Sequence, residues 1–131
     1  MAAESLVLAV DDEPAVLNVL ERILQREGYA VETAVNGVDA MLRFIETDYT
    51  FVMLDIAMPR MDGADTLRLM KKLKPEVPVV TFTGHVGRGE MTETVRLGAV
   101  TCLPKPITID QLRSALDMIT VEAQRGTPAA G

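Results

Sequence analysis

Five side chains that can do chemistry stand where short apolar runs of the sequence end. They are, in chain order, Asp11, Asp12, Asp55, Thr83 and Lys105. Carboxylates that crowd together raise one another's pKa values unless a cation neutralises them. A site made of oxygen ligands and water suits magnesium, which commonly takes one or two protein carboxylates together with phosphate oxygens. If the five side chains converge, we expect phosphoryl chemistry, with a carboxylate as the covalent acceptor and the metal, hydroxyl and ammonium stabilising the transferred charge.

The apolar runs themselves predict the elements that must position these side chains. Runs of Val, Leu, Ile, Phe and Met without polar alternation are typical of strands buried on both faces. Such runs predict strands at 6–10, 51–55, 77–83 and 100–103, and the alternating segment 29–34 predicts a further, shorter strand. Between and after them, apolar residues recur at helical spacing, from Pro14 to Gly28, around Ala40 to Ile45, over 64–74, over 90–97 and from Ile109 onwards.

This alternation of strand and helix predicts one α/β domain with a doubly wound, five-stranded parallel sheet and five helices. Right-handed crossovers then place helices on both faces of the sheet. Because all strands of a parallel sheet end at the same edge, the five reactive side chains are expected to meet there.

Length and composition limit the alternatives. A chain of 131 residues that is 48% hydrophobic fits one domain, and a formal net charge of −6 argues against direct binding of nucleic acid. No apolar segment approaches membrane-spanning length and the first residues lack the pattern of a signal peptide, so we expect a cytoplasmic protein without membrane contact. One cysteine excludes an internal disulfide, and one histidine excludes a typical zinc site.

The motifs together are similar to those of the receiver domain of bacterial two-component response regulators. The resemblance extends from Leu6 to about Ala123, so residues 1–123 are expected to form the domain and 124–131 a flexible tail or the start of a linker. It rests on Asp11-Asp12, Asp55 with Met58-Pro59-x-Met61-Asp62-Gly63 behind it, Thr83-Gly84, Gly98-Ala99 and Lys105-Pro106. By this resemblance the fold is flavodoxin-like, with strand order 2-1-3-4-5.

The resemblance implies that Asp55 accepts a phosphoryl group from a phosphohistidine of a sensor histidine kinase or phosphotransfer protein. Asp12, Asp55 and the backbone carbonyl of Ala57 would bind Mg²⁺ or Mn²⁺ directly, with Asp11 acting through water. Lys105 would pair with the phosphoryl group, and the peptide bond before Pro106 would be cis.

Phosphorylation is implied to draw the hydroxyl of Thr83 toward the phosphoryl group and so to change the affinity of one surface for a downstream protein or output domain. The chain would be a monomer or a phosphorylation-dependent dimer. Its role would be that of a signalling module that catalyses its own phosphorylation and slow dephosphorylation, not that of an enzyme acting on other substrates.

Three positions qualify this resemblance. Cys102 stands where the family usually has an aromatic switch residue, and a thiol is too small to fill or vacate the same pocket. The glycine-rich loop over 84–89 is the alternative place for a switch. Ala57 cannot orient a water as a polar residue would, and His85 occupies a second position that affects hydrolysis, so we expect a long-lived phosphorylated state.

Simpler interpretations and other functions remain open at this point. The simplest interpretation of Cys102 is a small buried apolar residue, and the simplest interpretation of His85 is an ordinary loop histidine. A degenerate receiver would act as an interaction module without phosphorylation. A haloacid-dehalogenase-like phosphohydrolase would need a second aspartate where Ala57 stands, and an FMN-binding flavodoxin is disfavoured because the acidic edge would repel the cofactor phosphate.

Overall fold

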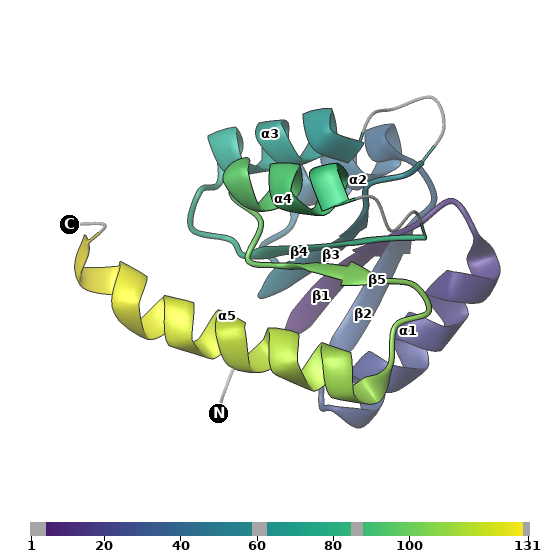
Figure 1. The fold of residues 1–131 in the computed structure, drawn as a ribbon. Coiled ribbons are helices and arrows are strands. Elements are labelled where there is room, and N and C mark those ends of the chain that lie inside the picture. Colours follow the sequence, from purple (N-terminus) through teal and green to yellow (C-terminus); the bar gives the residue numbers. More distant parts are fainter. Residues whose placement is uncertain (1–4, 59–62, 85–87, 130–131) are drawn as a thin grey trace.

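A parallel sheet of five strands forms the centre of the molecule, in the order β2-β1-β3-β4-β5 (Figure 1). The structure is a computed structural model and describes residues 5–58, 63–84 and 88–129. The strands are β1 (Leu6–Val10), β2 (Ala30–Ala34), β3 (Phe51–Asp55), β4 (Val79–Thr83) and β5 (Cys102–Pro104). The helices that alternate with them are α1 (Pro14–Arg26), α2 (Gly37–Glu46), α3 (Gly63–Leu73), α4 (Arg88–Arg96) and α5 (Ile109–Ala129). This is the doubly wound, flavodoxin-like fold that the sequence predicted.

The helices form two layers. α2, α3 and α4 cover one face of the sheet, and α1 and α5 cover the other (Figure 1). Each interface has its own apolar cluster. Phe44 of α2 and Leu67 of α3 are buried in the first cluster, and Leu20 of α1 and Leu112 of α5 are buried in the second. The sheet is therefore held from both sides, as right-handed crossovers require.

The central strands are apolar along their whole length because both of their faces are covered. Every residue of β3 and of β4 is buried, and four of the five residues of β1 are. The edge strand β2 differs, since only Ala34 at its end is buried. The continuous apolar pattern therefore identified the strands whose carboxyl ends lie in the middle of the sheet edge.

Some boundaries and orientations differ from the predictions. The last helix continues to Ala129, whereas the sequence pattern placed its end near Ala123. β4 begins at Val79, later than predicted. Ile45 was assigned to the apolar stripe of its helix but its side chain is 57% exposed, because it lies about 100° around the helix from the buried Phe44. These differences leave the positions of the strand ends unchanged.

Among the described helices, none combines the length and the apolar character that crossing a membrane requires.

Candidate functional site

The predicted reactive residues lie together at the carboxyl edge of the sheet. Asp11 follows β1, Asp55 ends β3 and Thr83 ends β4, and all three are almost completely buried. Asp12 is exposed at the same edge. Lys105 follows β5, and its backbone N–H donates to the carbonyl oxygen of Thr83 over 2.8 Å. The sheet itself thus fixes the backbone on which the side chains stand.

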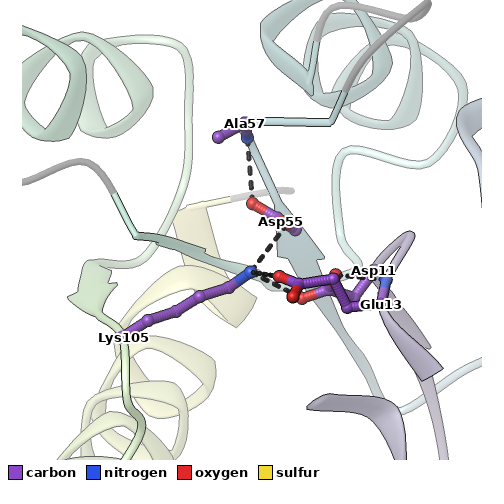
Figure 2. Close-up of polar contacts among 5 residues, drawn as sticks. All are labelled: Asp11, Glu13, Asp55, Ala57 and Lys105. Atoms are coloured by element: carbon purple, nitrogen blue, oxygen red, sulfur yellow. Dashed lines mark hydrogen bonds and ion pairs between the residues drawn. The ribbon is translucent and has the colours of Figure 1, made fainter. Parts of the chain in front are cut away.

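The ammonium group of Lys105 is the centre of the polar contacts (Figure 2). Its Nζ lies 2.9 Å from Asp11 Oδ2 and 3.0 Å from Asp55 Oδ2. A third carboxylate, Glu13, places Oε1 at 3.3 Å from the same nitrogen. The ammonium also lies 5.5 Å from the centre of the Phe82 ring, within range of a cation–π interaction. One cation therefore neutralises part of the charge of three carboxylates.

Burial and pairing shift the pKa values of two of these groups. Burial raises the pKa of Asp11 to about 6, although pairing with Lys105 and the backbone N–H of Glu13 act in the opposite direction. Burial alone would lower the pKa of Lys105, but its bonds to Asp11 and Asp55 outweigh this and raise that pKa above its ordinary value. Lys105 is accordingly charged throughout the physiological pH range, and Asp11 carries a costly charge at neutral pH.

Backbone N–H groups orient the two buried carboxylates. The N–H of Ala57 donates to Asp55 Oδ1 over 2.9 Å, and the N–H of Glu13 donates to Asp11 Oδ1 over 2.8 Å. Each bond comes from two residues further along the chain, where the backbone turns away from the strand. Each aspartate thus uses one oxygen for its own turn and directs the other, Oδ2, toward Lys105.

The acidic residues have the composition and spacing of a cation site. Asp11, Asp12 and Asp55 can each offer one oxygen such that all three oxygens lie within 4.8 Å of one another. Asp11 Oδ2 is buried and accepts no hydrogen bond from the described part of the chain, although Lys105 is its ion-pair partner. Hard divalent cations prefer such oxygen ligands. The residues present therefore fit a magnesium-type ion.

The turn after Asp55 is fixed by close packing against α3. Gly63, the first residue of α3, lies against the backbone of Ile56, and a Cβ atom at Gly63 would come within 2.3 Å of the Ile56 Cα. Only glycine fits so close an approach. The start of α3 therefore holds the backbone next to Asp55. Residues 59–62, which the sequence motif also includes, lie outside the described residues.

The predicted switch residues are placed only in part. Cys102 is buried in β5, as predicted, and a depression of about 390 Å³ beside it is lined by residues of α4, by Thr101 and by Cys102 itself. The peptide bond between Lys105 and Pro106 is cis. His85 and residues 86 and 87 of the glycine-rich loop lie outside the described residues.

Two features of this region were not predicted from the sequence. One is Glu13, whose acidic type next to Asp11-Asp12 was the only available signal for its contact with Lys105. The other is a buried hydroxyl pair, in which the Oγ1 atoms of Thr81 in β4 and Thr94 in α4 lie 3.0 Å apart. Both contacts join different elements of the fold, and sequence periodicity does not predict contacts between elements.

Comparisons with known proteins agree with this geometry. The family model of the response regulator receiver domain matches residues 7–117. The transcriptional regulatory protein CpxR homolog of Haemophilus influenzae is 38% identical over 118 residues, which are 88% of this chain and 50% of that protein. The chain thus spans about half the length of this relative.

Solved structures show the same similarity. A CheY-like response regulator receiver domain protein from Methanospirillum hungatei superposes with a TM-score of 0.87 at 26% identity, covering 95% of this chain and all of that one. The response regulator TrrA of Thermotoga maritima, solved with Mg²⁺-BeF, gives a TM-score of 0.80 at 29% identity and covers 88% of this chain and 98% of that one. With the strand order, the acidic edge and the family match in agreement, the chain belongs to the response regulator receiver domain family.

Proposed function

We propose that this receiver domain is phosphorylated on Asp55 and acts as the phosphorylation-controlled switch of a two-component pathway in the cytoplasm. The observation that carries the proposal is the position of Asp55 at the end of the fully buried β3, 3.0 Å from the Lys105 ammonium and within the acidic cluster. Family membership is consistent with this role. A response regulator of Burkholderia pseudomallei that resembles this fold has been solved with a phosphorylated aspartic acid.

In the proposed reaction an Asp55 carboxylate oxygen attacks the phosphorus of a phosphohistidine or of a small phosphodonor. A new oxygen–phosphorus bond forms while the bond to the donor breaks, and the electron pair of that bond leaves with the donor. The N–H of Ala57 holds one Asp55 oxygen, which limits the rotation of the carboxylate. Lys105 remains charged and lies close enough to pair with the transferred oxygens, and the hydroxyl of Thr83 would contribute a hydrogen bond.

Asp12, Asp55 and the carbonyl oxygen of Ala57 would hold Mg²⁺ or Mn²⁺, with Asp11 contributing through water. The ion would neutralise charge on the phosphoryl oxygens during transfer. The buried Oδ2 of Asp11, whose ion-pair partner is Lys105, supports this assignment because a nearby cation would further reduce the cost of burying its charge.

The proposed donor is a sensor histidine kinase or a phosphotransfer protein. The output is a change in the affinity of one surface for a downstream protein or for an output domain, in a monomer or in a phosphorylation-dependent dimer. The cited relative is named a transcriptional regulatory protein and is about twice as long as the matched region. Residues 124–131 would then serve as a tail or as the start of a linker.

Intact-protein mass spectrometry after incubation with acetyl phosphate and magnesium tests the proposal. We expect a mass gain of one phosphoryl group that is lost on acid treatment. The gain should be absent from Asp55→Asn and retained by Asp117→Asn, a control that neutralises an exposed aspartate of α5. No adduct on the unchanged protein would instead favour a degenerate receiver. Persistence of the adduct in Asp55→Asn would place the phosphoryl group elsewhere.

A further inference from the structure

Glu13 occupies a helix-capping position but does not cap the helix. It is the N-cap residue of α1, and its backbone carbonyl accepts the N–H groups of Val16 and Leu17. Its side chain makes no capping hydrogen bond. Ser, Thr, Asp and Asn are preferred at such positions because their short side chains reach the free N–H groups of the first turn. The glutamate side chain is therefore used for another contact.

That contact is with Lys105, which lies 92 residues further along the sequence. The Nζ–Oε1 distance is 3.3 Å, longer than the distances from Lys105 to Asp11 and Asp55. The exposures of the partners differ sharply: the side chain of Glu13 is 63% exposed, whereas those of Asp11 and Asp55 are 0% and 2% exposed. Glu13 is thus the one of these three partners that water can readily replace.

Both partners of this contact also line a cavity. A cavity of about 540 Å³ is lined by Glu13, Lys105 and residues of α1 and of the segment after β5. A small anionic phosphodonor that enters from this side meets the negative charge of Glu13 next to the positive charge that it needs. Two like charges several ångströms apart repel measurably even in water, and salt screens this repulsion.

We infer that Glu13 is a positioning and specificity-determining residue that holds Lys105 in its resting place and disfavours phosphorylation by small anionic donors. The inference rests on the proposed phosphorylation of Asp55. When the phosphoryl group arrives, Lys105 gains a strongly charged partner and gives up Glu13, the solvent-exposed contact, first. Replacement of Glu13 by glutamine keeps its length and its acceptor oxygen but removes the charge.

The test compares initial phosphorylation rates of the wild type, Glu13→Gln and Glu13→Asp in magnesium. Two donors are used: acetyl phosphate, and phosphoramidate, whose nitrogen carries a proton that cancels part of its negative charge. Each rate is measured at low and at high ionic strength. Glu46→Gln is the matched control, because it removes the same charge from the exposed C-terminal end of α2, at the opposite edge of the sheet.

For Glu13→Gln we expect the rate with acetyl phosphate at low salt to rise roughly threefold to tenfold. The rise should be smaller with phosphoramidate and should shrink at high salt. Glu13→Asp and Glu46→Gln should stay near the wild-type rate. Only a charge effect depends on the donor and on salt in this way, so a general structural change would not reproduce the pattern.

An unchanged or lower rate for Glu13→Gln, in a wild type that is phosphorylated, would overturn the role of Glu13 and leave the proposed function intact. A rise of equal size for both donors and at both salt concentrations would also overturn it. If the wild type forms no acid-labile adduct, the proposed function fails and this inference fails with it.

Discussion

At the scale of single residues, the site is a balance between two buried carboxylates and one partly buried ammonium. Lys105 forms close ion pairs with Asp11 and Asp55, yet burial still raises the pKa of Asp11 to about 6. An additional cation near Asp11 would lower the free-energy cost of its buried charge. The excess of negative charge at the site destabilises the metal-free protein, and the same excess favours the binding of a metal ion.

This balance predicts a pH-dependent effect of Asp11→Asn on the metal-free protein. The pKa of Asp11 rises from 3.8 to about 6 on folding, so the folded state binds the proton more tightly and the contribution of this group to stability falls as pH increases through that window. We expect the variant to be about 1–3 kcal/mol more stable than the wild type at neutral pH. The difference should shrink toward pH 4.

Denaturant unfolding in the presence of a chelator, repeated across this pH range, measures the effect. Equal or lower stability of Asp11→Asn at neutral pH would mean that the Asp11 charge is not costly in the folded protein. Magnesium should stabilise the wild type more than the variant, because the variant lacks one of the acidic groups near the ion.

Ala57 is a second residue whose identity has a testable consequence. Its N–H orients Asp55, but its methyl side chain cannot hold a water molecule near the proposed acyl phosphate. We expect Ala57→Asn to lose its phosphoryl group about fivefold faster than the wild type, the rate equivalent of one hydrogen bond of roughly 1 kcal/mol. The decay is followed by mass spectrometry after removal of the donor, from equal starting phosphorylation. A fast-decaying wild type whose rate does not change in Ala57→Asn would contradict this account.

At the scale of elements, the turn after β3 depends on the first residue of α3. A Cβ atom at Gly63 would lie 2.3 Å from the Cα and 2.7 Å from the carbonyl oxygen of Ile56. These are backbone atoms, so a rotamer change cannot relieve the overlap. A larger residue at Gly63 would therefore affect both the stability of the protein and the backbone geometry next to Asp55.

Gly63→Ala should therefore lower the free energy of unfolding by about 1–3 kcal/mol or more, as overpacking of a buried site does. Gly84→Ala is the matched control, because among the described residues its Cβ would meet only the Lys105 Cδ at 3.7 Å, an ordinary contact. The control should change stability by less than about 0.5 kcal/mol. Equal stability of both variants in denaturant unfolding would show that α3 can shift away from Ile56 at no cost.

The elements also show which parts of the site could be predicted from sequence. The ends of β1 and β3 were predictable because both are central strands, whose apolar runs stop abruptly at Asp11 and Asp55. Parallel topology then brought the strand ends to one edge. The contact between Glu13 and Lys105 was not predictable in this way, because it joins residues 92 positions apart and depends on the direction of one side chain.

At the scale of the whole molecule, layer architecture was easier to predict than element length. The alternation of strands and helices predicted the parallel sheet and its two helical layers, and the family resemblance implied the strand order that the structure has. The length of α5 was not predicted, because the small and polar residues after Ala123 have weak periodicity, and the helix nevertheless continues to Ala129. The exposed Ile45 was missed because a helical stripe predicted from spacing is wider than the strip that α2 buries.

The fold and the site together favour one carboxylate for the proposed reaction. The sheet delivers Asp55 to an acidic edge, Lys105 lies against it, and the family match covers most of the chain. An aspartate at the end of a strand can have many roles. For Asp55 these observations favour one of them, acceptance of a phosphoryl group with a metal ion bound nearby.

Borohydride reduction followed by peptide sequencing tests this claim most directly, because it converts an aspartyl phosphate to homoserine and so marks the modified residue. After treatment with acetyl phosphate and magnesium, we predict homoserine at position 55 and at no other aspartate, and none when magnesium is replaced by a chelator. Homoserine at Asp11 or Asp12, or its absence from position 55 in protein that carries a phosphoryl group, would contradict the account.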